Sequence, residues 1–229
     1  MAYDKTILCL ANSRKKAGSC IAGKEVLEEN FGEWIRPVSD RQFEEIPRRD
    51  LRYKDGSSAA LLDIINISMI EPRPKSYQSE NHLYRSGYYW ARIGRATWDE
   101  IVAATDKLSG PLWVNGYSSY NGLNDRIPEA IASTLKNSLL LINPSQLRVI
   151  VAEEDGTYGP ERRVRADFRF SGHQYKLAVT DPWMEQHYLA GSDGSFAIKI
   201  ARLCVSLGEI FQGFTYKLVA AVITPERAK

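Results

Sequence analysis

Cysteine, histidine and methionine are scarce in this sequence, with three of each in 229 residues. The cysteines Cys9, Cys20 and Cys204 form no CxxC pair and no cluster with histidine at metal-ligand spacing. This pattern argues against a disulfide framework and a structural zinc site, and it suits a reducing cytoplasm. We therefore expect a cytoplasmic protein that needs no cofactor and no metal.

Long apolar runs are absent as well. The run near the N-terminus is too short for the apolar region of a secretory signal, and no segment of about 18 apolar residues could span a bilayer. A soluble protein without a membrane partner is the expectation.

An excess of one charge is also lacking, because the formal net charge is only +2 at pH 7. This value excludes a protein that coats polyanions generally, so any nucleic-acid contact must come from locally clustered cations. A hydrophobic content of 44% and this length allow either one all-β unit or two small domains.

Strand patterns run through both halves of the chain. β-Branched and apolar residues predict strands at 6–12, 19–23, 33–39 and 60–70, followed by an irregular excursion over 71–95. A capping box at Thr97 and Glu100 predicts a helix from Trp98 to about Leu108, and a second helix is expected near 128–138.

The C-terminal part has the clearer order. Alternating residues predict strands at 146–154, 163–170, 174–180, 198–207 and 215–224, with a helix at 182–190. Five strands with a helix after the third is the order of an OB-fold. We predict a mainly β (α+β) chain with inserted helices and two OB-fold-like five-stranded barrels, one in 1–140 and one in 141–229.

Three phrases of the sequence stand out: CLANSRKKAGSCIAGKE and WIRPVS near the N-terminus, and LCVSLGEIFQGFTYKLVAAVI near the C-terminus. Together they resemble the signatures of the prokaryotic dual OB-containing domain family. The resemblance implies two OB-folds, nucleic-acid recognition, and a place in bacterial conflict or antiviral systems with protein partners. It implies no catalytic residues.

A basic loop follows the first predicted strand and is a candidate anion contact. Its cations and polar groups could face a phosphate, and a solvated turn would explain them equally well. The loop is no Walker A motif, because GxxxxGK[ST] is absent, and Ser13 and Cys20 lack a neighbouring histidine that could activate a nucleophile. The candidate residues are Asn12, Ser13, Arg14, Lys15 and Lys16.

Aromatic and basic residues alternate at two other places. Trp34 and Arg36 share one face of a strand, where they could serve base stacking and phosphate pairing, or could be core and an internal ion pair. The excursion over 71–95 has the pattern of a single-strand binding segment, or of a loop that anchors itself through its aromatics. Its candidate contacts are Arg73, Lys75, Tyr84, Arg85, Tyr88, Tyr89, Trp90 and Arg92.

Two further clusters have simpler explanations. The charged segment 40–55, which includes Arg49 and Arg52, balances its cations with acids and is expected to be a solvated surface. Asp181, Glu185 and His187 could form an acid–base or metal site, but Asp181 before Pro182 is also a helix N-cap.

The leading hypothesis is a non-enzymatic protein that binds single-stranded or distorted nucleic acid, DNA or RNA. One alternative is a small-ligand sensor or protein-partner module that uses a cleft between the two barrels. The other alternative is an enzyme that processes nucleic acid, with Asp181, Glu185 and His187 or Cys20 as its chemical groups.

Overall fold

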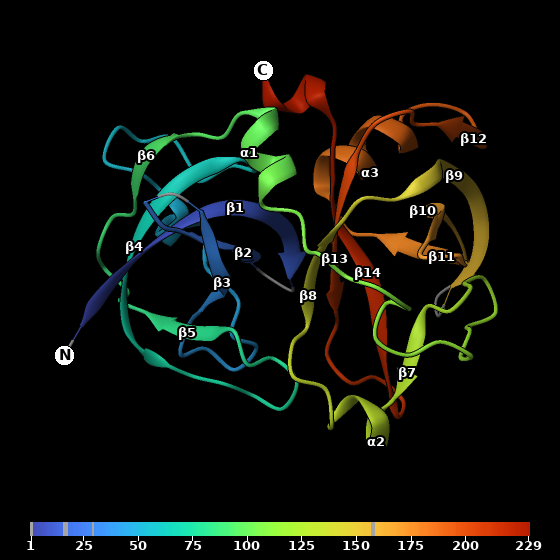
Figure 1. Cartoon of the computed structure of the whole chain (residues 1–229), viewed down its shortest axis with the longest axis horizontal. Coiled ribbons are helices and arrows are strands. Elements are labelled where there is room, and N and C mark those ends of the chain that lie inside the picture. Colours follow the sequence, from blue (N-terminus) through green and yellow to red (C-terminus); the bar gives the residue numbers. More distant parts are fainter. Residues whose placement is uncertain (1, 16–17, 29, 157–158) are drawn as a thin grey trace. The chain divides into compact units, whose positions relative to one another are not determined.

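The computed structural model describes residues 2–15, 18–28, 30–156 and 159–229 (Figure 1). Contacts within the chain divide it into two compact units. Unit 1 comprises residues 1–104, 136–138 and 226–229, and unit 2 comprises residues 105–135 and 139–225. Among the described residues, every helix is too short or too polar to cross a bilayer.

Unit 1 contains a closed barrel of five strands. The strand order is β1-β2-β3-β5-β4, and β4 also pairs with β1, which closes the sheet. All of these pairs are antiparallel except β3 with β5, which is parallel. The elements are β1 (Tyr3–Lys15), β2 (Gly18–Val26), β3 (Phe31–Val38), η1 (Arg48–Leu51), β4 (Asp63–Pro72), β5 (Asn81–Tyr84), β6 (Ala91–Arg95) and α1 (Trp98–Ala103).

Strand β1 serves two neighbours because it is long and irregular. It pairs with β4 from Tyr3 to Leu8 and with β2 from Ile7 to Lys15, with a bulge between Cys9 and Ala11 in the pairing with β2. Gly23 of β2 lies against this bend, where a Cβ atom would come within 2.0 Å of the Leu8 carbonyl oxygen. Glycine is therefore required at Gly23 by close packing of two backbones, and the interior of the barrel is filled by residues such as Ile7, Ile21 and Ile65.

Unit 2 contains a second barrel with the same order of pairing. The first strand is split at Asn143 and Pro144 into β8, which pairs with β13, and β9, which pairs with β10. Strand β11 pairs with β14 in parallel, as β3 does with β5. The elements are β7 (Arg126–Pro128), α2 (Glu129–Ala132), β8 (Leu139–Ile142), β9 (Ser145–Gly156), β10 (Gly159–Phe170), β11 (His173–Val179), α3 (Pro182–Leu189), β12 (Gly194–Ala197), β13 (Arg202–Leu207), β14 (Phe214–Ile223) and η2 (Pro225–Ala228), whose last three residues group with unit 1.

The predicted fold class is confirmed, and several boundaries differ from the predicted ones. The capping box of α1 forms, but the helix ends at Ala103 because no apolar periodicity continues it. The second predicted helix has only four residues. The excursion over 71–95 holds two strands, β5 and β6, which are too short to show a period in the sequence.

The predicted division at residue 140 lies beside the point where the chain passes from unit 1 to unit 2, after Ser138. Residues 105–135, which the sequence groups with the N-terminal part, have most of their contacts within unit 2.

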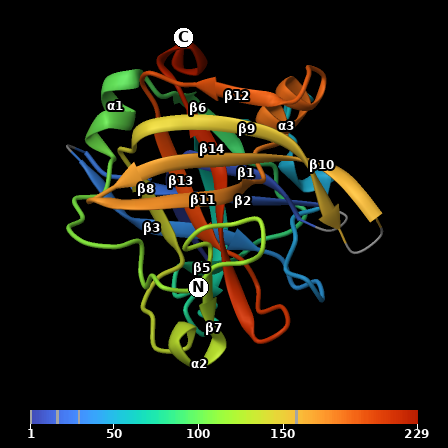
Figure 2. The same ribbon diagram turned by 90° about the vertical axis from the view of Figure 1, so that its right-hand side faces the viewer.

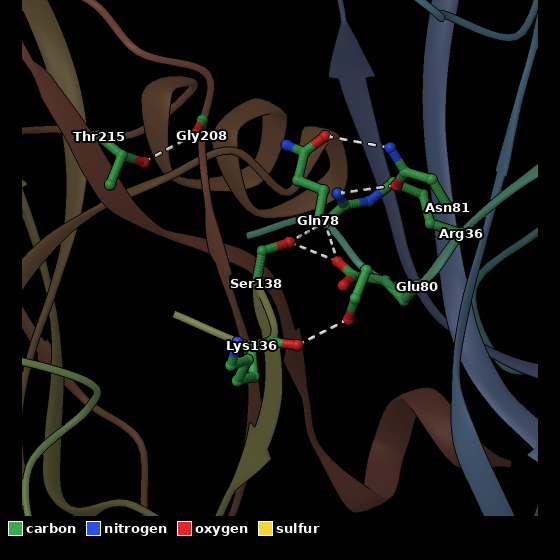
Figure 3. Close-up of polar contacts among 9 residues, drawn as sticks. Arg36, Gln78, Glu80, Asn81, Lys136, Ser138, Gly208 and Thr215 are labelled. Atoms are coloured by element: carbon green, nitrogen blue, oxygen red, sulfur yellow. Dashed lines mark hydrogen bonds and ion pairs between the residues drawn. The ribbon is translucent and has the colours of Figure 1, made fainter. Parts of the chain in front are cut away.

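A buried polar network holds residues 136–138 in unit 1 (Figure 3). The Arg36 guanidinium pairs with Glu80 at 3.1 Å and donates to the Ser138 hydroxyl at 2.9 Å, and that hydroxyl donates to Glu80. The Ser79 hydroxyl adds a bond of 2.6 Å to the Lys136 carbonyl oxygen. The charge of Arg36 is thus compensated inside the protein, as the alternative interpretation of WIRPVS anticipated.

A buried lysine plays the corresponding part in unit 2. Lys217 of β14 is 1% exposed and donates to the Val114 carbonyl oxygen at 2.7 Å and to Asn115 Oδ1 at 3.1 Å. These bonds hold an irregular segment against the barrel. Burial lowers the pKa of Lys217 to about 7, and the nearby Asp125 carboxylate opposes this effect.

The Arg36 network generates a stability prediction. Ser138→Ala should lower the free energy of unfolding by about 1–3 kcal/mol, because it leaves buried groups without a partner. Glu80→Gln should cost about 3–5 kcal/mol, since it leaves the Arg36 charge uncompensated. Urea unfolding measures both, and Ser58→Ala, at an exposed serine of the same unit, should change stability by less than about 0.5 kcal/mol. A cost for Ser138→Ala equal to that of the control would contradict the prediction.

The pKa of Lys217 generates a pH prediction. Between pH 7 and the ordinary lysine value of 10.5, the unfolded chain binds a proton that the folded chain does not, so stability should rise with pH. Comparing the free energies of unfolding at about pH 7 and about pH 9, we expect this rise to be smaller in Lys217→Met than in the natural chain. The exposed Lys107→Met should keep the rise. An equal rise in all three proteins would show that another group titrates.

A candidate nucleic-acid interface

A hollow of about 470 Å³ lies on the surface of unit 1 and brings cations and aromatic rings together. One wall comes from residues 49–52, at the 3-10 helix η1. The other comes from residues 86–89, in the turn between β5 and β6. Its lining residues are Arg49, Asp50, Arg52, Ser86, Gly87, Tyr88 and Tyr89.

The aromatic wall is a turn anchored at both ends. Tyr84 and Trp90 flank it, are each 2% exposed, and meet edge to face with ring centroids 5.8 Å apart. Gly87 supplies the left-handed backbone of the turn, with φ +80°. Tyr88 and Tyr89 consequently stand out at the tip, 52% and 64% exposed. Exposed rings on a fixed turn can stack on the bases of a strand with little loss of side-chain freedom.

The basic wall is tied to the same turn. The Tyr84 hydroxyl donates to Asp50 Oδ2 at 2.6 Å, and Arg49 pairs with the other oxygen of Asp50 at 3.3 Å. Burial and the neighbouring Asp50 carboxylate raise the pKa of Tyr84, which keeps its proton available for this bond. The one carboxylate of the hollow is therefore engaged by its own neighbours, while the guanidinium of Arg49 extends into solvent with 79% of its side chain exposed.

Arg85 adds a cation at the rim. Its guanidinium lies 3.9 Å from the centre of the Tyr88 ring, which is a cation–π contact. Arg92 lies farther along, 3.8 Å from Asp55 and 5.7 Å from the Tyr53 ring. The cations Arg49, Arg52 and Arg85 outnumber the one carboxylate that lines the hollow. They give the hollow a positive potential, which attracts phosphate.

The structure separates the sequence-predicted residues of the excursion into three groups. Tyr84 and Trp90 are buried and support the turn, so their predicted contact with nucleic acid needs correction: their rings already pack on each other. Arg73 and Lys75 form surface ion pairs with Glu71 and Glu44, each at 3.2 Å. The exposed group comprises Arg85, Tyr88, Tyr89 and Arg92.

The pair Trp34 and Arg36 is also buried, 9% and 4% exposed, so neither reaches the surface. Their strand lies wholly within the core from Trp34 onward because it pairs on both sides, with β2 and β5. The prediction of direct contact is corrected for both.

The opening basic loop forms the tip of the β1–β2 hairpin. Arg14 is exposed, Lys15 and Ser13 are half-buried, and Lys16 lies outside the described residues. Asn12 donates from Nδ2 to the Ala59 carbonyl oxygen at 2.9 Å, so this side chain ties β1 to the segment that precedes β4. Near the tip of the hairpin, Ser19 forms a β-bridge with Ile46. Ile46 is three residues before Arg49, so the bridge lies within about 10 Å of chain from the hollow.

Sequence reasoning missed Arg49 and Arg52. Their segment looked like a balanced, solvated surface, and their partners Tyr88 and Tyr89 come more than 30 residues later. No local pattern connects the two segments; only the packing of η1 against the β5–β6 turn does.

The acid–base candidates of unit 2 have a structural role. Asp181 is 2% exposed and caps α3, accepting from Trp183 N at 3.1 Å and Met184 N at 3.4 Å, and it also accepts from Val222 N. The capping interpretation is confirmed. His187 stacks on Trp183 with centroids 5.0 Å apart. Within the described residues, no group of three His, Cys, Asp or Glu side chains could hold a metal ion.

A comparison with known families can be set beside this fold of two closed barrels. The family model of the dual OB-containing domain covers residues 5–222, nearly the whole chain. The chain belongs to this family. No curated protein and no solved structure matches it. Membership supports an OB-type binding module, and in this dual OB-containing chain the hollow of unit 1 is where aromatic and basic side chains meet.

The Tyr84–Asp50 bond generates a prediction about how the hollow is held. Tyr84→Phe removes a buried hydroxyl and leaves Asp50 with one partner fewer, so the free energy of unfolding should fall by about 1–2 kcal/mol. Tyr88→Phe, at an exposed ring of the same turn, should change it by less than about 0.5 kcal/mol. Denaturant unfolding of both variants tests this, and equal effects would mean that the bond contributes nothing.

Proposed function

We propose that this protein binds single-stranded nucleic acid through the hollow of unit 1. The observation that carries the proposal is the meeting of Tyr88 and Tyr89 with Arg49 and Arg52 around one surface depression. Basic grooves lined with aromatic side chains bind single strands, because every base offers a face for stacking and every nucleotide offers a phosphate.

Each part of the hollow has a chemical role in this proposal. The Tyr88 and Tyr89 rings stack on successive bases, and Arg85, stacked on Tyr88, extends this platform. The Arg49 and Arg52 guanidiniums pair with phosphate oxygens. Arg14 and Lys15 of the β1–β2 hairpin and Arg92 give additional contacts to the backbone of the strand. In OB-folds the loop between the first two strands often takes part in such binding.

A duplex suits this hollow less well. Its bases are stacked on one another, so Tyr88 and Tyr89 could reach them only after unstacking. We therefore expect a preference for single strands over duplex, and we infer the setting from the family resemblance alone: a cytoplasmic defence system of a bacterium in which foreign nucleic acid is recognised. The proposal includes no chemical step.

The first test uses the tyrosines. Titration of labelled single-stranded DNA, single-stranded RNA and duplex should show at least tenfold weaker single-strand binding for Tyr88→Ala/Tyr89→Ala, since a stacked base contributes about 1–3 kcal/mol. The matched control is Tyr117→Ala/Tyr120→Ala, which removes two exposed tyrosines from unit 2. Equal loss in both pairs, or no binding by the natural chain, would refute the proposal.

The same titration at two salt concentrations tests the arginines. Arg49→Gln/Arg52→Gln should reduce the slope of log K against log salt by about 1.4, the value for two phosphate contacts on a single strand. Lys107→Gln/Arg163→Gln removes two exposed cations of unit 2 and should leave the slope unchanged. An unchanged slope in the Arg49/Arg52 variant would remove these residues from the interface.

A further inference from the structure

A second basic hollow, of about 510 Å³, lies on the outer face of the unit 2 barrel. Strands β12, β9, β10 and β11 lie side by side there (Figure 2). Residues of β9, β10 and β11 that alternate with the core residues Leu147 and Phe168 point outward and line it. Its polar lining is Gln146, Arg148, Asp167, Arg169, Gln174 and Lys199.

The hollow coincides with an irregularity in the sheet. Between the pairs Arg148–Asp167 and Ser145–Arg169, β9 advances three residues while β10 advances two. Gln146 lies in this bulge and has a backbone in the left-handed region, with φ +53°. A non-glycine residue held in that region is strained, and such strain is concentrated at functional sites.

The cations around the bulge differ from the other cations of β10, which form ion pairs with carboxylates. Arg162, Arg163 and Arg165 of β10 pair with Asp193, Glu161 and Glu154 at 2.5–2.7 Å. In contrast, within the described ranges no carboxylate forms an ion pair with any of the three cations of the hollow. These cations are Arg148, Arg169 and Lys199, and all are exposed.

The donors that remain are suited to an oxyanion. Arg148 Nε donates to the Ser195 hydroxyl at 2.7 Å, which fixes the guanidinium while its terminal nitrogens remain available. Gln174 donates to Asp167 at 3.1 Å, so the one carboxylate of the hollow already has a hydrogen-bond donor. Two guanidiniums and an ammonium around one depression match the several oxygens of a phosphate, which a guanidinium can bind through two parallel bonds.

We propose that this hollow is a second anion site, which takes the phosphate group of a nucleotide, either free or within a strand. The inference goes beyond the function proposed for unit 1, because it depends on no residue of that unit. Phe168 also lines this hollow but is only 1% exposed, so no exposed ring among its lining residues corresponds to Tyr88 or Tyr89. The phosphate rather than the base is consequently the group that it recognises.

Calorimetric titration of the whole chain with inorganic phosphate, a nucleoside monophosphate and the same nucleoside without phosphate tests the site. We expect the monophosphate to bind and the nucleoside not to bind. Arg169→Gln/Lys199→Gln should weaken monophosphate binding at least tenfold, and Lys107→Gln/Arg163→Gln, which removes the same charge from the same unit, should not. All four side chains are exposed or engaged only at the surface, so thermal unfolding should be unchanged.

The outcomes distinguish free phosphate from the phosphate of a nucleotide, and they test this site separately from the hollow of unit 1. If inorganic phosphate binds as tightly as the monophosphate and loses as much affinity in Arg169→Gln/Lys199→Gln, the site recognises phosphate alone. If the monophosphate or an oligonucleotide binds more tightly than inorganic phosphate, the site recognises a nucleotide. No binding, equal binding of the nucleoside, or equal loss in the control overturns the inference. Loss in Tyr88→Ala/Tyr89→Ala alone would also overturn it while leaving the unit 1 proposal standing.

Discussion

Closure of each sheet is the constraint on which the rest of this structure depends. In unit 1 the parallel pair β3–β5 and the antiparallel pair β1–β4 join the ends of the sheet, and in unit 2 the pairs β11–β14 and β13–β8 do the same. Closure satisfies the backbone hydrogen bonds of the strands that form the barrel. Among the described residues, the remaining edge strands β6, β7 and β12 have only five, three and four residues. Binding is consequently left to loops and to outward-facing side chains.

Each unit also contains a buried cation that holds a segment lying outside the barrel strands. Arg36 of β3 holds Ser138, and Lys217 of β14 holds Val114 and Asn115. A buried charge contributes little net stability, since the cost of desolvation offsets the attraction. Its value here lies in specificity: the segment can dock only where it supplies oxygen atoms to the cation. Arginine and lysine thus position segments of the chain when they are buried, and they are available to bind a ligand when they are exposed.

The two candidate sites follow a common physical logic. In unit 1 the anchors Tyr84 and Trp90 bury their rings, and this burial places Tyr88 and Tyr89 in solvent beside Arg49 and Arg52. In unit 2 a bulge at Gln146 opens the outer face of the sheet among cations without a carboxylate partner. A local departure from regular structure, fixed by neighbouring core residues, creates each hollow.

The sequence by itself determined the fold class, the strands β9, β10, β11, β13 and β14, the helix α3, the capping box of α1 and the N-cap Asp181. All of these depend on neighbours within a few residues, whereas the short strands β7, β8 and β12 were missed. The sequence also identified the β5–β6 turn as aromatic and basic. Only the tertiary structure decided which of those residues are exposed, since Tyr84 and Tyr88 look alike in a local pattern. Arg49 and Tyr88 line one hollow, and Arg169 has no carboxylate partner among the described residues. Both facts depend on segments that are distant in the sequence, so no local signal could have shown them.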